Sequence, residues 1–109
     1  LTGGNFGDIR MLKPGAVARN MTKSKKIDDL TFKSRVSFIK IDCQGFDYKV
    51  IMGAENTINK HRPTVVVEWE EHMANYHGDT LDKLKGCLSR LNYNIEHLLW
   101  SDWICTPKT

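Results

Sequence analysis

The stretch VSFIKIDCQGFDYKVIMGAEN, residues Val36–Asn56, decides the fold of this 109-residue chain. It opens with an apolar, β-branched run, Val36–Ile41, which is typical of a strand covered on both faces in a parallel sheet. The run ends in Asp42, and Gly45 follows three residues later, where the chain can turn sharply. Apolar residues with a helical period come next and predict a helix over Asp47–Asn59.

A second β-branched run, TVVVEW at Thr64–Trp69, follows this helix, so the order is strand, helix, strand. A crossover of about 20 residues between two such strands is typical of a right-handed βαβ unit. Gly53 lies inside the predicted helix, and close packing against the sheet would compensate for its poor helix propensity. Pro63 predicts an extended backbone at the preceding residue, Arg62.

The rest of the chain predicts one more helix and two short strands. A stripe of leucines predicts the helix over Thr80–Leu91, with Asp79 as its N-cap. The segment NYNIEHLLWSDWICTP then predicts an antiparallel hairpin at the sheet edge, turning at Ser101–Asp102. We expect Trp69, Trp100 and Trp103 in the core or packed at this edge.

These elements define one α/β domain over residues 1–109. Residues 1–35 form an irregular lead-in, and residues 36–109 follow the order βαβαββ. Hydrophobic content of 40% and charged content of 27% are those of a globular protein. No apolar run approaches the ~20 residues that a membrane span needs. The start, LTGGNFGDIRM, lacks an initiator Met and is interpreted as the middle of a longer protein.

The distributions of cysteine and charge indicate the compartment of the protein and the partners that it could bind. The three cysteines are widely spaced and form no CxxC pair, which predicts reduced thiols in a cytoplasmic protein. Residues 1–40 carry nine Lys and Arg against three Asp and Glu. The cluster KSKK, Lys23–Lys26, has no interleaved aromatic residues and is interpreted as a solvated loop rather than a nucleic-acid site.

Acidic residues follow both predicted parallel strands. In an open α/β sheet, ligands bind beyond the carboxyl ends of the strands. Neighbouring strands lie ~4.8 Å apart, so Asp42 and either Glu68 or Glu70 are expected to face one crevice. His72 follows the second strand on the same side and is a candidate proton acceptor. The structural alternatives are that Asp42 caps the next helix and that Glu70, Glu71 and His72 are solvated loop residues.

The block FIKIDCQGFDYKVIMGAENTINKHRPTVVVE, Phe38–Glu68, closely resembles the central block of the FkbM-type methyltransferases. The positions that match the family pattern are Lys40, Ile41, Asp42, Gly45, Asp47, Gly53, Ala54, Arg62, Pro63 and Glu68. The similarity extends over about residues 25–97, and Gln44 stands where the family usually has Glu. Nothing in residues 1–35 matches the family's Gly-rich cofactor loop or ribose-binding carboxylate, so the chain resembles the C-terminal half of such an enzyme.

The resemblance implies a partial Rossmann-like class I methyltransferase sheet, with a parallel pair and then an antiparallel edge hairpin. It implies methyl transfer from S-adenosylmethionine to a hydroxyl on a sugar or a secondary metabolite. A divalent metal between Asp42 and Glu68 is compatible with their oxygen atoms but is not predicted. The implied catalytic residues are Asp42, Glu68 and His72, and the implied cofactor-binding residues are Asp42, Cys43, Gln44 and Gly45.

Two other interpretations remain open. Asp42, Glu68 and Glu70 could hold Mg²⁺ in a metal-dependent phosphodiesterase or nuclease-like enzyme. Alternatively, the chain is a non-catalytic interaction module derived from a methyltransferase. An exposed sheet edge beside Val36–Ile41 would then pair with another chain and form an oligomer. The expected partner of the enzyme is a small molecule such as a glycan, with no membrane and no nucleic acid involved.

Overall fold

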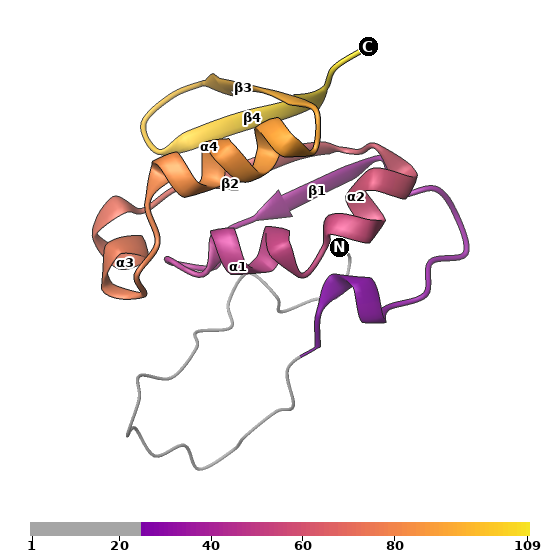
Figure 1. The fold of residues 1–109 in the computed structure, drawn as a ribbon, viewed down its shortest axis with the longest axis horizontal. Helices are drawn as coiled ribbons and strands as arrows, with labels where there is room; N and C mark the ends of the chain where they lie inside the picture. Colours follow the sequence, from indigo (N-terminus) through magenta and orange to yellow (C-terminus); the bar gives the residue numbers. More distant parts are fainter. Residues whose placement is uncertain (1–24) are drawn as a thin grey trace.

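The structure is a computed structural model of the chain and describes residues 25–109. A four-stranded sheet is covered by helices α1, α2 and α4 (Figure 1). In chain order the elements are η2 (Ile27–Asp29), β1 (Phe38–Ile41), α1 (Asp47–Met52), α2 (Glu55–His61), β2 (Thr64–Glu68), α3 (Glu71–Tyr76), α4 (Leu81–Arg90), β3 (Tyr93–His97) and β4 (Asp102–Pro107). None of the helices within residues 25–109 is long and apolar enough to cross a membrane.

The strands are arranged in the order β1-β2-β4-β3. β1 and β2 are parallel, which confirms the predicted βαβ unit. β4 is antiparallel to both β2 and β3, so the predicted hairpin is also confirmed. The predicted turn at Ser101–Asp102 is right for Ser101 and wrong for Asp102, because the loop covers residues 98–101 and Asp102 already begins β4. The expected place of the hairpin at the sheet edge is confirmed, with β3 as the edge strand and β4 paired on both sides.

The core lies between the sheet and the helices. Ile39 and Ile41 of β1 and Val65 and Val67 of β2 are at most 2% exposed, and they point to the helical layer. Phe38, on the other face of β1, is 52% exposed. The prediction that this strand is covered on both faces is therefore wrong for the described residues. Within residues 25–109, β1 pairs on one side only, so the expected exposed sheet edge is present.

The predicted helix over Asp47–Asn59 is interrupted. α1 ends at Met52, Gly53 is its C-cap, and α2 starts at Glu55. A Cβ atom at Gly53 would lie 3.3 Å from the Cβ and Cγ atoms of Lys26. Gly53 thus packs against the segment before β1 and not against the sheet, which corrects the expected reason for this glycine.

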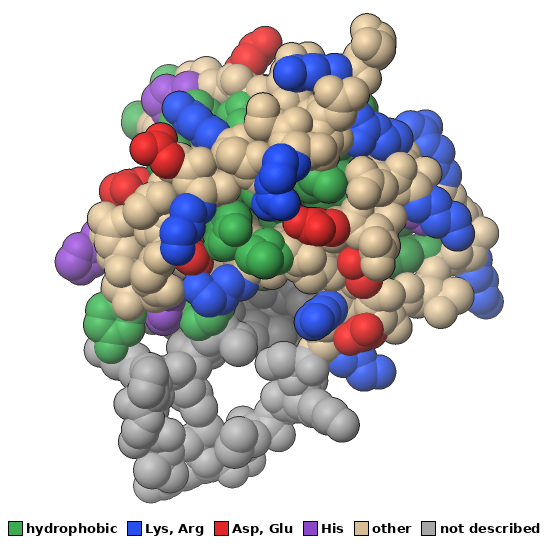
Figure 2. Space-filling model, in the orientation of Figure 1, with side chains coloured by type: hydrophobic (Ala, Val, Ile, Leu, Met, Phe, Trp, Pro, Cys, Tyr) green, Lys and Arg blue, Asp and Glu red, His purple; other side chains and the backbone are tan. Residues whose placement is uncertain are grey.

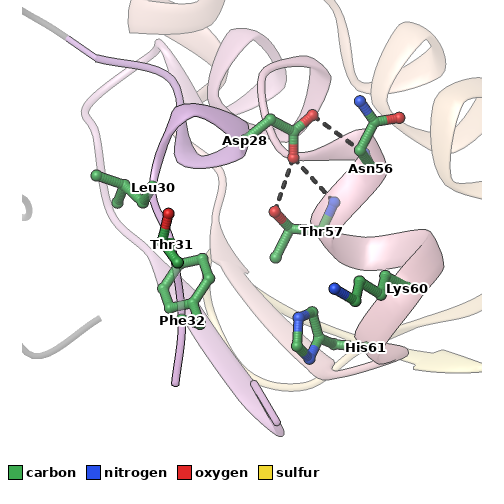
Figure 3. Close-up of a pocket in the computed structure, with 8 residues that line it drawn as sticks. All are labelled: Asp28, Leu30, Thr31, Phe32, Asn56, Thr57, Lys60 and His61. Carbon is green, nitrogen blue, oxygen red and sulfur yellow. Dashed lines mark hydrogen bonds between the residues drawn. The ribbon is translucent and has the colours of Figure 1, made fainter. Parts of the chain in front are cut away.

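Asp28 of η2 connects the segment before β1 to the start of α2 through hydrogen bonds (Figure 3). Its carboxylate accepts hydrogen bonds from the backbone N–H of Asn56 (3.1 Å), the backbone N–H of Thr57 (2.9 Å) and the Thr57 hydroxyl (2.7 Å). Burial raises the pKa of Asp28, but these hydrogen bonds outweigh it and leave the pKa below its ordinary value. A cavity of about 280 Å³ beside this contact is lined by residues of η2, the following loop and α2. His61 accepts a hydrogen bond from the Val36 N–H and Thr57 donates to Asp28, and none of the expected catalytic or cofactor-binding residues lines this cavity.

Arg62 ends α2 in a left-handed conformation, with φ 52° and ψ 51°. The expectation of an extended backbone before Pro63 is therefore wrong. A left-handed residue commonly terminates a helix, and here the side chain contributes as well. The guanidinium donates hydrogen bonds to the carbonyls of Leu91 (2.6 Å) and Asn92 (2.9 Å), which stabilise this backbone conformation.

Two helices differ in detail from the sequence prediction. Thr80, not Asp79, caps α4, since its hydroxyl accepts a hydrogen bond from the Lys83 N–H. Asp79 is buried and forms an ion pair with Lys49 at 2.6 Å. α3 covers a segment that the sequence suggested as a loop, so Glu71 and His72 lie in its first turn.

The tryptophans and cysteines follow the predictions only in part. Trp69 is buried and Trp103 packs against the core, but Trp100 is 83% exposed, so its expected packing is wrong. The three cysteines are free thiols, as predicted. Burial raises the pKa of Cys105 to about 12.

Candidate functional site

Two carboxylates meet at the carboxyl ends of the parallel strands. Ile41 of β1 is paired with Val67 of β2, so the following residues, Asp42 and Glu68, are neighbours across the two strands. The charge of Asp42 raises the pKa of Glu68, and burial and a hydrogen bond with Asp42 raise this pKa further. The predicted proximity of these two residues is therefore found in the structure.

Asp42 and Glu68 line a cavity of about 340 Å³. The other residues that line it are Gln44, Glu70 and Met73. Figure 2 shows Lys and Arg side chains over the middle and the right of this face, and in the same orientation β1 points to the left. The cavity thus combines several carboxylates with a single apolar wall, and it favours neutral or cationic ligands over anionic ones.

A third carboxyl group, that of Asp47, is buried beneath these two. Asp47 is the first residue of α1 and is 0% exposed. Its Oδ1 accepts a hydrogen bond from the Cys43 N–H at 2.9 Å, while its Oδ2 has no hydrogen-bond partner among the described residues. Burial raises the pKa of Asp47 to about 7; the Cys43 hydrogen bond opposes this, and the charges of Asp42, Glu68 and Glu70 add to it. Near neutral pH, a large fraction of Asp47 is therefore uncharged.

A tight turn carries the chain from Asp42 to α1. Gln44 and Gly45 have φ values of 48° and 98°, and the Phe46 N–H donates to the Cys43 carbonyl at 3.2 Å. A left-handed conformation is uncommon for glutamine, and such strain often occurs at functional sites. A Cβ atom at Gly45 would lie 2.6 Å from the Met73 carbonyl carbon and oxygen. This glycine lets α3 approach the turn and place Met73 on the cavity.

Contacts with α1 hold α3 in this position. The Lys49 ammonium pairs with Asp79 and also donates to the His77 carbonyl at 3.0 Å. The rings of Phe46 and His77 lie with their centroids 4.0 Å apart. At the start of α3, the Trp69 indole N–H donates to the Glu71 carboxylate. These contacts hold α3, which places Met73 on the cavity, against α1 and against the residue that follows β2.

The structure brings together only some of the residues that the sequence suggested. Asp42, Gln44 and Glu68 line the cavity, whereas the side chain of Cys43 packs against the core and Gly45 is buried under α3. Burial raises the pKa of Cys43 to about 11, and nearby Asp47 raises it too, so its thiol is protonated at neutral pH. His72 is exposed on α3 and does not line the cavity.

Sequence reasoning missed several members of the site. Asp47 matched the family pattern, but its burial depends on the turn folding back toward Cys43. Asp102 lies opposite Glu68 because of the register between β2 and β4, which the misplaced hairpin turn concealed. For Met73 the sequence contains no signal, because its place depends on the packing of α3 against Gly45.

The carboxylates that line the cavity suit an organic cation better than a metal ion. Residues 25–109 contain no group of three or more His, Cys, Asp and Glu side chains that could hold a metal ion. The carboxylates of Asp42, Glu68 and Glu70 suit the positive end of S-adenosylmethionine, whose sulfonium and amino groups are cationic. Within the same residues, no Gly-rich loop that would hold the adenosine end follows a strand.

A comparison with protein families matches residues 18–94 to the methyltransferase FkbM domain. The match covers more than half of the chain, and the chain belongs to the FkbM methyltransferase family. No curated protein and no solved structure matches the chain. The family match confirms the resemblance carried by the block around Asp42 and Gly45.

Proposed function

We propose that this chain is the C-terminal part of an S-adenosylmethionine-dependent O-methyltransferase with a Rossmann-like sheet, which acts on a hydroxyl of a glycan or a secondary metabolite. The single observation that carries the proposal is the pair of Asp42 and Glu68. These carboxylates lie where parallel strands present ligand-binding residues and line the same cavity. The family match supports methyl transfer, and the free thiols agree with a cytoplasmic setting.

When bound, S-adenosylmethionine supplies a methyl group activated by its sulfonium. The protein then has to hold the acceptor hydroxyl in line with that methyl group and remove its proton. Glu68 is the proposed proton acceptor, since its raised pKa makes it a stronger base than an ordinary glutamate. Asp42 accepts a hydrogen bond from the same hydroxyl and orients it. Glu68 would take the proton of the acceptor hydroxyl, and the bound cofactor would supply the methyl group to the hydroxyl oxygen.

The turn after β1 is proposed to contact the cofactor. Gln44 lines the cavity, and the turn that it forms with Gly45 is held against α3. Asp42 and Glu70 complement the positive charge of the sulfonium, and Cys43 contributes its backbone rather than its thiol. The role suggested for His72 stays a prediction, which His72→Ala would test by its effect on the turnover rate.

The first test is calorimetric titration of S-adenosylmethionine into the folded chain. Asp42→Asn keeps the shape of the side chain and removes its charge, and we expect binding at least about tenfold weaker. Asp82→Asn, on the exposed part of α4, is the matched control and should bind like the wild type. Unchanged binding in Asp42→Asn would contradict the proposed role of Asp42, and no binding by a chain that circular dichroism shows to be folded would contradict a cofactor site in this part of the enzyme.

An interaction module is the second candidate, and the unpaired side of β1 within the described residues favours it. An exposed strand edge offers backbone groups to another chain, and Phe38 adds exposed apolar surface. Sedimentation over a range of concentrations would measure self-association. Phe38→Lys should weaken it by placing a charge at the edge, and a monomer at every concentration would exclude pairing between copies. The phosphodiesterase alternative has no comparable observation in its favour.

A further inference from the structure

Three consecutive apolar side chains extend from the loop between β3 and β4. Leu98, Leu99 and Trp100 are 53%, 58% and 83% exposed. Single apolar residues are ordinary on a protein surface. Three in a row at the tip of a loop form a contiguous apolar projection, and such projections commonly mark binding surfaces.

This loop lies at the same end of the sheet as the acidic cavity. Asp102 follows the loop directly and is paired with Glu68 across the two strands. The Ser101 carbonyl accepts a hydrogen bond from the Trp69 N–H at 2.8 Å, so the loop also contacts the segment after β2. Trp100 is two residues from Asp102, and their Cα atoms are within about 7 Å of each other. Figure 1 shows the β3–β4 loop on the side toward which β1 points.

Hydrogen bonds fix the backbone of the loop. The Leu98 N–H donates to the Asp102 carbonyl and the Asp102 N–H donates to the Leu99 carbonyl, both at 2.9 Å. The ring of His97 contacts the Trp100 carbonyl through Nε2. Trp100 has φ 53°, a left-handed conformation that a bulky residue rarely adopts and that persists only where the surroundings impose it. The loop therefore presents its apolar side chains from a preorganised backbone.

The charges nearby restrict what can bind to this projection. The negative charges of Asp42, Glu70 and Asp102 raise the pKa of Glu68, so the surroundings of this carboxyl group are acidic. An anionic lipid surface or an anionic small molecule would be repelled by these groups. An uncharged molecule with a hydroxyl would place that hydroxyl on the carboxylates and its apolar part on the loop.

We propose that the Leu98–Trp100 loop binds the apolar part of the methyl acceptor, and that this acceptor is a compound without negative charge that has a ring beside its hydroxyl. The inference rests on the proposed function, because it treats the cavity of Asp42 and Glu68 as the place of the reacting hydroxyl. A ring packed on the Trp100 indole gains both buried area and an offset-stacked contact. The loop then determines which hydroxyl compounds bind, while the carboxylates act on the hydroxyl itself.

Three glycosides that differ by one feature test this inference. They are 4-nitrophenyl β-D-glucopyranoside, methyl β-D-glucopyranoside, which lacks the aromatic ring, and 4-nitrophenyl β-D-glucuronide, which is anionic. We expect calorimetry to show binding of the first about tenfold tighter than that of either of the others. Trp100→Ala should remove the preference for the aromatic ring. Phe38→Ala is the matched control, since Phe38 is a 52% exposed aromatic residue at the opposite end of β1, and it should keep the preference.

The possible results distinguish ligand binding by the loop from the proposed methyl transfer. Equal binding of the nitrophenyl and methyl glucosides, tighter binding of the glucuronide, or an unchanged preference in Trp100→Ala would each overturn the inference. Binding to phosphatidylcholine vesicles that Trp100→Ala abolishes would overturn it in favour of a lipid surface. S-adenosylmethionine is titrated into the same samples and should bind wild type and Trp100→Ala alike. A retained ring preference without cofactor binding would overturn methyl transfer and leave the loop as a ligand-binding element.

Discussion

Replacing Asp47 with asparagine should stabilise the protein at neutral and alkaline pH. The folded state raises the pKa of Asp47 from 3.8 to about 7, chiefly through burial. Between these two values the folded chain holds more protons than the unfolded chain, so the free energy of unfolding falls as the pH rises. Three pKa units at 1.36 kcal/mol each give a loss of up to about 4 kcal/mol by pH 8. An asparagine side chain carries no charge, and its amide oxygen can still accept the Cys43 N–H.

Urea unfolding followed by circular dichroism at pH 4, 5.5, 7 and 8 measures this effect. Asp47→Asn and the wild type should have similar stabilities at pH 4, and the variant should become the more stable by up to about 4 kcal/mol at pH 8. Asp82→Asn, in an exposed position of α4, controls for the general loss of a negative charge and should follow the wild-type curve. Parallel curves for Asp47→Asn and the wild type would refute the reasoning, as would a variant that is less stable at pH 8.

Three further changes test the packing around the site. Gly45→Ala forces a positive φ on alanine and a 2.6 Å contact with the Met73 backbone, so thermal unfolding should show a loss of about 3 kcal/mol in the free energy of unfolding. Gly86→Ala is the control, because its new Cβ atom meets nothing within 4 Å, and its free energy of unfolding should rise by up to about 1 kcal/mol. Asp28→Ala removes three hydrogen bonds at the start of α2 and should cost about 2 kcal/mol in urea unfolding, and a change below about 0.5 kcal/mol would contradict this anchoring role. Cys43 should react with iodoacetamide at pH 8 far more slowly than it does in the urea-unfolded chain, because its pKa is about 11; equal rates would show that the thiol is not protected.

Local patterns predicted the parts of the fold that depend on neighbours in the sequence. The β-branched runs before Asp42 and Glu68 became β1 and β2, and the leucine stripe became α4. The side-chain period of each segment decides which element it forms and where its buried face lies, so these predictions needed no tertiary information. The placement of two carboxylates at adjacent strand ends followed from the same patterns.

Predictions failed where a distant contact changed the local preference. Arg62 is left-handed because its guanidinium reaches carbonyls about thirty residues away, against the usual effect of Pro63. Gly53 interrupts a helix where Lys26 approaches, and Asp79 pairs with Lys49 in place of capping α4. Each of these depends on elements that are far apart in the chain.

The sequence by itself determined the family, the βαβ unit and the positions of Asp42 and Glu68, because periodic burial and turn residues are local properties of the chain. Only the tertiary structure decided what surrounds this pair. Strand register set Asp102 beside Glu68, and the missing side chain of Gly45 let α3 bring Met73 to the cavity. The same fold buried Asp47 and left Trp100 in solvent. Burial and electrostatic coupling depend on distances through space, which sequence spacing does not specify.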